Sequence, residues 1–374
     1  MKVRKVIAIL LSAVVGGGLV ATATSVGVLP LGKNLDIATA TEPFYGLHQN
    51  GIETERQAHS TLVALDLKPG KDLAAVGRMM RVLTSDAALL TQGLPIIGDP
   101  QSEMAENPAR MTINFSFGYS LFEKVGVENR WPIIEKRIPA YSIDKLENRW
   151  NDGDFLIQIS GDNPQSIFHA AHTLVKESAP FATIRWQQRG FLDPAQVNVG
   201  EDSRNLMGQI DGTANAPINS KEFKERTWSS SGALKNGTTV VVRRIQLNLG
   251  TWDRLSANMK GDSLGRELTD GKKLSKDENF SKSHVGRAFT SNNLGITRRG
   301  YNYDDNYLPN GVHDVGLIFI SYQESLSRYL NIQESLNKQD ELNRWTTPIG
   351  SALFVAPAGV KEGDWIGSEL FTNR

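Results

Sequence analysis

Short apolar runs typical of β-strands recur along the whole chain and alternate with stretches of helical periodicity. The strand-like runs lie at 60–67, 111–122, 154–162, 183–192, 238–249, 315–323 and 351–359. Apolar residues at helical spacing occupy 71–91, 164–179 and 326–338. Several strands look paired as hairpins rather than joined by βαβ crossovers, so the pattern predicts an α+β fold and not a doubly wound parallel sheet.

Composition limits the chemistry available to this chain. Its 374 residues suffice for two domains with a sizeable core. Cysteine is absent, which excludes disulfides, iron–sulfur clusters and a thiol nucleophile. The 41 basic and 41 acidic side chains balance, which argues against a nucleic-acid partner.

The first 40 residues follow the plan of an export signal. Residues 1–5 carry three basic side chains, 6–15 are almost entirely apolar, and two Ala-x-Ala cleavage sites follow, the second ending at Ala40. The alternative is an uncleaved anchor, because 6–29 is long enough to span a bilayer. In either case we expect an exported protein, extracellular or attached to the cell envelope, whose membrane contact is confined to this segment. No twin-arginine pair is present, which leaves the export route open.

The densest local motif is RNLMGQIDGTANAP at 204–217. Glycines at Gly208 and Gly212 flank Asp211, an arrangement that indicates a tight backbone and an exposed carboxylate. The motif is neither a Walker A loop nor a dinucleotide-binding G-x-G-x-x-G. Without other information an ordinary turn remains the alternative.

Two further segments stand out in the second half. SKSHVGRAF at 281–289 contains His284, one of only six histidines, and GITRRGYNYDD at 295–305 contains the pair Arg298-Arg299. A lone histidine is often structural and an arginine pair is often a solvated turn, so each segment alone is weak evidence of a site.

Together these segments resemble the dye-decolourising (DyP-type) haem peroxidases. GQIDGTAN is similar to the family's Gly-x-x-Asp-Gly signature, SHVGR to the segment of the axial haem histidine, and ITRRGYNYD to the segment of the distal arginine. EPFYGLHQNGI at 42–52 is similar to the start of the exported, iron-uptake-associated deferrochelatase/peroxidase branch, and TPIGSALFVAPAG at 347–359 to the family's last strand. Five matches in the right order are more specific than any one of them.

The resemblance implies a role for each matching residue. His284 would be the axial ligand of the haem iron, and Asp211 and Arg298 would be the catalytic residues on the opposite, distal side. The residues expected to bind the cofactor are His284, Arg298, Gly212, Thr213 and Arg243. An acidic or polar partner of the axial histidine is expected at 341–343, where Asn343 is the best-aligned residue, with Glu341 and Asp340 nearby.

The same resemblance implies two ferredoxin-like domains with antiparallel sheets and the haem held between them. We expect domain 41–232 to carry the distal Asp211 and domain 233–374 to carry His284. The boundary is predicted within 225–237, which is polar and rich in Ser and Gly.

The function implied is a peroxidase with one non-covalent haem b per chain. It would use hydrogen peroxide to oxidise dyes, phenols or similar one-electron donors through a ferryl intermediate. One alternative is deferrochelatase-like release of haem iron, with iron-uptake proteins of the envelope as partners. A second alternative is a non-haem substrate-binding protein of the envelope, which would need none of Asp211, His284 and Arg298.

Two other histidines lie three residues apart on the helix expected at 164–179. His169 and His172 have a spacing that can bind metal, but no acidic residue accompanies them at helical spacing and the flanking residues are apolar. We therefore predict packing roles for them.

Overall fold

The computed structural model describes residues 37–198, 200–275, 280–289 and 295–372. The export signal predicted at 1–40 lies almost wholly outside these residues. The described residues belong to one compact unit. Within the described ranges, none of the helices combines the length and the apolar character needed to cross a bilayer.

Nine strands are present in the described residues, and every pairing between them is antiparallel. The strands are β1 (His59–Leu67), β2 (Thr112–Phe117), β3 (Phe155–Gly161), β4 (Ala182–Phe191), β5 (Thr238–Leu247), β6 (Thr297–Arg298), β7 (Tyr301–Tyr307), β8 (His313–Gln323) and β9 (Thr346–Ala356).

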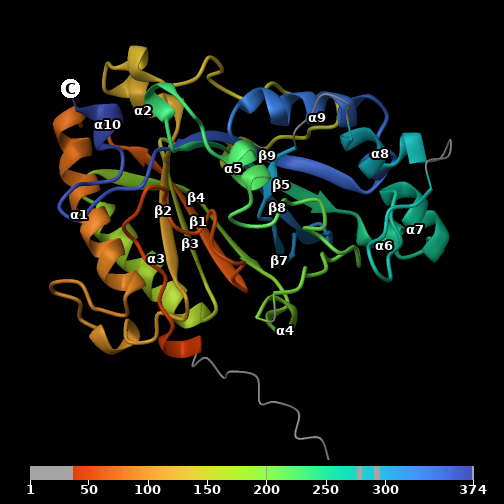
Figure 1. Ribbon diagram of the computed structural model, residues 1–374, viewed down its shortest axis with the longest axis horizontal. Coiled ribbons are helices and arrows are strands. Elements are labelled where there is room, and N and C mark those ends of the chain that lie inside the picture. Colours follow the sequence, from red (N-terminus) through yellow and green to blue (C-terminus); the bar gives the residue numbers. More distant parts are fainter. Residues whose placement is uncertain (1–36, 199, 276–279, 290–294, 373–374) are drawn as a thin grey trace, which may run out of the picture. The chain divides into compact units, whose positions relative to one another are not determined.

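The longest helices are α1, α3 and α9, and the others are short (Figure 1). The α-helices are α1 (Leu73–Thr91), α2 (Tyr119–Lys124), α3 (Pro164–Ser178), α4 (Pro194–Val197), α5 (Lys221–Thr227), α6 (Leu249–Trp252), α7 (Ala257–Leu264), α8 (His284–Ala288), α9 (Leu326–Gln339) and α10 (Ser368–Phe371).

The same ferredoxin-like arrangement occurs twice along the chain. The first half runs β1-α1-β2-β3-α3-β4, with strands in the spatial order β4-β1-β3-β2. The second half has the equivalent order β9-β5-β8-β7, with α9 between β8 and β9. The predicted α+β fold with two ferredoxin-like units is therefore confirmed. The predicted boundary near 232 lies in the segment 192–237 that joins β4 to β5, and it stays a prediction.

The two half-sheets join edge to edge into a closed ring of eight strands. Two short joints connect them: Phe117 of β2 pairs with Val355 of β9, and Phe191 of β4 pairs with Asn302 of β7. Long ladders of β5 with both β8 and β9 complete the ring, and β6 adds only to β8. Closure, together with the outer helices, explains why the runs of β1 and β3 read as almost continuously apolar, because these two strands are covered on both faces.

Strand β1 illustrates this two-sided burial. Leu62 and Ala64 belong to the apolar cluster inside the ring. Val63 and Leu65 belong to the outer cluster beneath α1 and α3, which lie side by side in Figure 1. Since successive side chains of a strand point to opposite faces, the ring needs apolar residues at every position here.

The segment 42–52 acts as a strap across one joint of the ring. The side-chain amide of Gln49, which is 2% exposed, donates to the carbonyls of Phe115 and Pro357, both at 2.9 Å. Its oxygen accepts the N–H of Phe115 at 2.8 Å. The neighbouring His48 ring stacks on Trp228 at 3.9 Å. The strap therefore fastens β2 to the end of β9 and to the segment between the two halves.

Helix α1 buries a carboxylate that destabilises the fold at neutral pH. Asp86 is 9% exposed, and its Oδ2 has no hydrogen-bond partner among the described residues. Burial, with a smaller contribution from Glu177, raises the pKa of Asp86 to about 6. Folding therefore favours protonated Asp86, and the stability that this provides in acid is lost as the pH rises through about 6.

We predict that Asp86→Asn stabilises the protein at pH 8 by about 2 kcal/mol and by almost nothing at pH 4, since the amide carries no charge at either pH. Urea unfolding of the variant and the wild type at both pH values measures this. The exposed Asp262 of α7 provides the control Asp262→Asn, for which a change of less than about 0.5 kcal/mol is expected. An equal gain for Asp86→Asn at both pH values would contradict the explanation.

Candidate functional site

The motif at 204–217 forms a tight turn between the two halves. An isolated antiparallel bridge joins Arg204 and Ile210. Asp211 follows the turn, and its N–H donates to the carbonyl of Ser203 at 3.0 Å. The backbone thus fixes the position of Asp211 and leaves its carboxylate available to side chains and ligands.

The structure brings Asp211 and Arg298 together, as predicted. Arg298 Nη1 lies 3.5 Å from Asp211 Oδ1, and the two side chains are 26% and 19% exposed. Asn215, at the tail of the same motif, bonds both the N–H and the carbonyl of Arg298. Its Nδ2 donates to the Arg298 carbonyl at 2.8 Å, and its Oδ1 accepts the Arg298 N–H at 2.9 Å. The motif therefore supplies the carboxylate and also positions its cation.

Arg56 is a site residue that the sequence did not reveal. Its Nη1 donates to the Asp211 carbonyl at 2.9 Å and its Nη2 donates to the Gly300 carbonyl at 2.8 Å. Arg299, by contrast, is 4% exposed and donates to the backbone of 54–55 and to Gln57. Arg56 thus ties together the segments of Asp211 and Arg298, whereas Arg299 is structural.

Asp202 explains why the motif requires glycine after the aspartate. Gly212 has φ +123°, and a Cβ there would lie 2.2 Å from Asp202 Oδ1. Arg56 Nη1 lies 3.9 Å from the same oxygen. Burial raises the pKa of Asp202, although the Arg56 cation opposes this. A second carboxylate therefore lies directly against the backbone of the Asp211 motif.

A cavity of about 420 Å³ opens beside these groups. Its walls come from the segment before β1, from the motif and from β6. The polar and charged residues that line it include Glu55, Arg56, Glu201, Asp202, Thr213, Asn215, Asn219, Arg298 and Arg299. Gly212 also lines it. The cavity connects the Arg298 side chain with solvent.

His284 forms a separate pair with a buried carboxylate. His284 Nδ1 and Asp340 Oδ2 are 2.7 Å apart, and the two side chains are 28% and 2% exposed. Of the three residues that the sequence offered, Asp340 is therefore the partner, and the best-aligned Asn343 is not, because its Nδ2 donates to the Leu336 carbonyl. Asp340 occupies Nδ1, so the Nε2 of His284 is the nitrogen left to bind a ligand.

Helix α8 presents His284 at its first residue. Ser283 caps the helix by accepting the Gly286 N–H at 3.1 Å. A Cβ on Gly286 would lie 1.8 Å from the Phe280 carbonyl oxygen, so only glycine allows this close approach. The SHVGR motif therefore encodes the cap, the ligand and the packing of one short helix.

The segment 264–274 lies against both the Asp211 motif and the cap of helix α8, which carries His284. The guanidinium of Arg204, in the Asp211 motif, donates to the carbonyls of Leu268 and Thr269. Gly265 lies against Ser283, whose Oγ would be 2.3 Å from a Cβ on that glycine. This segment thus connects the turn of Asp211 with the cap of the His284 helix.

The structure does not bring Arg243 to these groups. Its guanidinium is 2% exposed, forms an ion pair with Asp144 and lies 3.3 Å from the Tyr329 hydroxyl. Its charge is compensated within the protein, so the geometry gives no support to the predicted cofactor-binding role.

The two histidines of α3, for which packing roles are predicted, lie in different surroundings. The buried His169 Nε2 lies 2.8 Å from Asp99 Oδ2, and His172 is exposed and stacks on Phe168. No cluster of metal-binding side chains occurs within the described ranges.

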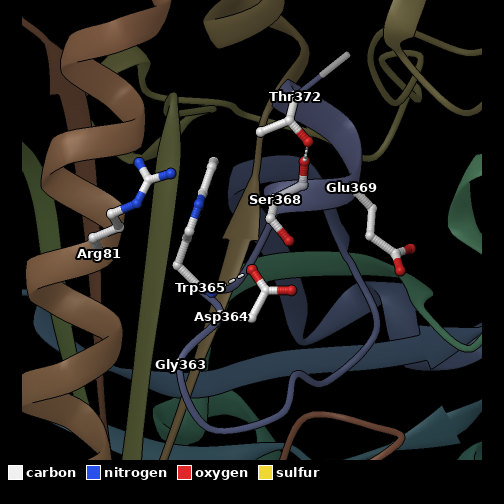
Figure 2. Close-up of a pocket in the computed structure, with 7 residues that line it drawn as sticks. All are labelled: Arg81, Gly363, Asp364, Trp365, Ser368, Glu369 and Thr372. Atoms are coloured by element: carbon white, nitrogen blue, oxygen red, sulfur yellow. Dashed lines mark hydrogen bonds between the residues drawn. The ribbon is translucent and has the colours of Figure 1, made fainter. Parts of the chain in front are cut away.

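A second cavity, of about 280 Å³, lies beside α1 and α10 (Figure 2). It is lined by Arg81, Gly363, Asp364, Trp365, Ser368, Glu369 and Thr372. Figure 2 shows the Arg81 side chain on α1 beside the Trp365 ring. None of the predicted site residues lines this cavity, so we do not place the reaction there.

Two family models match the chain over most of its length. Residues 49–192 match the model "Dyp-type peroxidase, N-terminal" and residues 202–361 match "Dyp-type peroxidase, C-terminal". The chain belongs to the Dyp-type peroxidase family. It is thus a peroxidase, and the family implies a haem cofactor, hydrogen peroxide as oxidant and a reducing substrate.

Characterised relatives support the same assignment. The dye-decolorizing peroxidase of Thermobifida fusca is 33% identical over 359 residues, covering 86% of this chain and 83% of the relative. The deferrochelatase of Escherichia coli K12 is 30% identical over 376 residues, covering 90% of this chain and 88% of the relative.

Solved structures have the same fold. The DyP-type peroxidase from Cellulomonas bogoriensis superposes with a TM-score of 0.84 at 34% identity, covering 90% of this chain and 99% of its own. Ferric DtpA from Streptomyces lividans superposes with a TM-score of 0.85 at 30% identity, covering 90% of this chain and 98% of its own.

The residues present fit a haem. His284 offers Nε2, because Asp340 occupies Nδ1. Ile245, Leu317 and Phe319 remain partly exposed on the outer face of β5 and β8, where an apolar macrocycle could cover them. A Cβ on Gly300 would lie 3.5 Å from Leu317 and 3.6 Å from Asp211 Oδ2, so Asp211 lies at this apolar face.

We predict that Asp340→Asn weakens haem binding about 10–100-fold, since the carboxylate orients the imidazole and increases its basicity. Titration of the haem-free chain with haem, followed by absorbance, measures the affinity. Asn343→Ala is the matched control and should bind haem as the wild type does. Equal losses in the two variants would contradict the pairing of His284 with Asp340.

Proposed function

We propose that this peroxidase binds one haem b per chain non-covalently, with His284 Nε2 as the axial ligand, and oxidises dyes, phenols or similar one-electron donors. The observation that carries the proposal is the Asp211–Arg298 pair at an apolar face of the second half. The His284–Asp340 pair supports it, because a carboxylate-oriented imidazole is a strong donor to iron.

Asp211 moves the proton of the peroxide. Hydrogen peroxide must lose a proton from one oxygen and gain one on the oxygen that leaves. An ionised carboxylate can accept the first proton and return it to the second oxygen, as general base and then general acid. The N–H of Asp211 donates to the Ser203 carbonyl, and Arg56 donates to the Asp211 carbonyl. These two hydrogen bonds hold the backbone of Asp211 in place for both transfers.

Arg298 stabilises charge rather than moving protons, because a guanidinium stays protonated. Its cation lies 3.5 Å from Asp211, where it can stabilise the negative charge that develops as the O–O bond is polarised. Asn215 fixes its backbone, so the guanidinium is positioned before peroxide enters. When bound, haem supplies the redox chemistry that cleaves the O–O bond and accepts electrons from the donor.

We also propose that the protein is exported through the segment 1–40, as its basic and apolar pattern suggests. An extracellular or envelope location follows from this proposal. Any contact with the membrane would be made by this segment, if it stays uncleaved.

A second candidate function is the release of iron from haem. The deferrochelatase of Escherichia coli K12, 30% identical over 88% of its length, favours it. This function would place the protein with iron-uptake proteins of the envelope. It predicts that protoporphyrin accumulates from haem without turnover of peroxide. The non-haem binding protein is no longer a candidate, because the chain belongs to a peroxidase family.

We predict that the haem-loaded protein shows a Soret band that changes with one equivalent of hydrogen peroxide at mildly acidic pH. Addition of a reducing dye should restore the original spectrum. A Soret band that peroxide leaves unchanged, with protoporphyrin accumulating, would favour iron release. The absence of any Soret band after addition of haem would contradict the proposal.

Two substitutions separate the proposed roles. His284→Ala should abolish stable haem binding, whereas Arg298→Leu should keep haem and slow the reaction with peroxide about 100- to 1000-fold, because charge stabilisation is lost. Absorbance titration and stopped-flow mixing measure the two effects. Arg78→Leu, on the exposed side of α1, is the control and should change neither. Full haem binding by His284→Ala would disprove the axial assignment.

A further inference from the structure

Reduction of hydrogen peroxide consumes protons as well as electrons. Each peroxide takes two electrons from the reducing substrate and two protons to give two waters. Asp211 can move a proton between the two oxygens, but it cannot supply the additional protons. The distal side therefore needs a group that exchanges protons with solvent.

Asp202 lies where such a group is needed. It lines the cavity of about 420 Å³ that also contains the Arg298 side chain. Its side chain is 38% exposed, twice the 19% of Asp211, so it is the more accessible of the two carboxylates. Its Oδ1 lies directly against Gly212, the residue that follows Asp211.

Arg56 lies between the Asp202 carboxylate and the backbone of Asp211. Its Nη1 donates to the Asp211 carbonyl at 2.9 Å and lies 3.9 Å from Asp202 Oδ1. The charged groups that act on Asp202 from the surrounding elements are Arg56, Asp211, Arg298 of β6 and Arg266 after α7. Glu55 and Glu201 line the same cavity.

The balance of these groups raises the pKa of Asp202 above its ordinary value. Burial raises the pKa of Asp202, the negative charge of Asp211 raises it further, and the arginines oppose both. A carboxyl with this environment binds a proton more readily than an exposed aspartate does.

We propose that Asp202 is a proton-relay residue of the distal site, which takes protons from water in this cavity and passes them, through water, to Asp211. In each transfer an O–H bond of the Asp202 carboxyl breaks and an O–H bond forms on water, which then protonates Asp211. Asp202 does not touch the peroxide, so it is a positioning residue and not a catalytic one. This inference rests on the proposed function.

The test compares Asp202→Asn and Asp202→Glu with Glu201→Gln in the haem-loaded protein. Glu201 is exposed and lines the same cavity but is not packed on Gly212. Steady-state turnover with saturating hydrogen peroxide and a reducing dye, from pH 4 to pH 7, measures the steps that take up protons, and stopped-flow mixing with hydrogen peroxide alone measures the step that takes up none. We expect Asp202→Asn to slow turnover about tenfold and to change its pH profile, with the reaction with peroxide alone almost unchanged. Asp202→Glu should restore the profile, and Glu201→Gln should match the wild type.

A second measurement does not depend on activity. Thermal unfolding of the haem-free chain reports whether Asp202 takes up a proton. Since burial raises its pKa, ionisation of Asp202 destabilises the fold as the pH rises. The melting temperature of Asp202→Asn, relative to the wild type, should therefore increase from pH 4 to pH 7, and that of Glu201→Gln should not.

The outcomes distinguish the inference from the proposed function. If the wild type reacts with peroxide and Asp202→Asn turns over the reducing dye at the wild-type rate over the whole pH range, the relay is disproved and the function stands. Equal slowing by Asp202→Asn and Glu201→Gln would also disprove it, because only the charge of the cavity would then matter. A wild type that binds haem but does not react with peroxide would overturn the proposed function and the relay with it.

Discussion

Arg244 holds the two halves of the ring together at the joint of β4 with β7. The joint itself is a single residue pair, Phe191 with Asn302. Inside the ring, Arg244 of β5 binds both carboxylate oxygens of Asp314 at 3.0 Å and the side chain of Gln188 on β4 at 2.7 Å. The guanidinium thus links both half-sheets. A buried arginine without these partners would be strongly destabilising, so the ring and its central ion pair require each other.

Aromatic rings complete this arrangement. The guanidinium of Arg244 lies between Trp150 at 4.3 Å and Tyr303 at 4.0 Å. Trp150 comes from the segment before β3 and Tyr303 from β7, so the stack also spans the two halves. At the other joint the amide of Gln49 has the equivalent role. Each short joint is therefore reinforced by one buried polar side chain. Because hydrogen bonds are directional, these side chains specify the register of the joined strands more strictly than apolar packing does.

The site depends on the same closure. Arg56 lies just before β1, in the first half, yet it binds the carbonyls of Asp211 and Gly300. Only a closed ring brings these segments together. Arg56, the segment of Asp202 and Asp211, and Arg298 thus come from three separate parts of the chain.

Sequence periodicity predicted most of the fold because β1, β3, β5 and β9 are buried on both faces and read as apolar runs. The short β6 and the polar β7 carry no such pattern, and they were missed as separate strands. Asp211, Arg298 and His284 were recognisable because each lies in a local motif. Arg56, Asn215 and Asp202 were missed, because their roles depend on contacts across the fold: Arg56 meets Asp211 across 155 positions and Asn215 meets Arg298 across 83. As the partner of His284, the sequence favoured Asn343 over Asp340. Neighbouring residues after α9 cannot be told apart in this role without knowing which way each side chain points.

The bonds between Asn215 and Arg298 have a further consequence for the sheet. Within the described residues β6 pairs with β8 alone, so its other side is an open edge. Asn215 presents an amide oxygen and an amide N–H₂ to the N–H and carbonyl of Arg298, as the backbone of a neighbouring strand would. One side chain therefore takes the place of an additional strand. It occupies the free edge of β6 beside the reactive arginine, where a foreign strand could otherwise add to the sheet and aggregate.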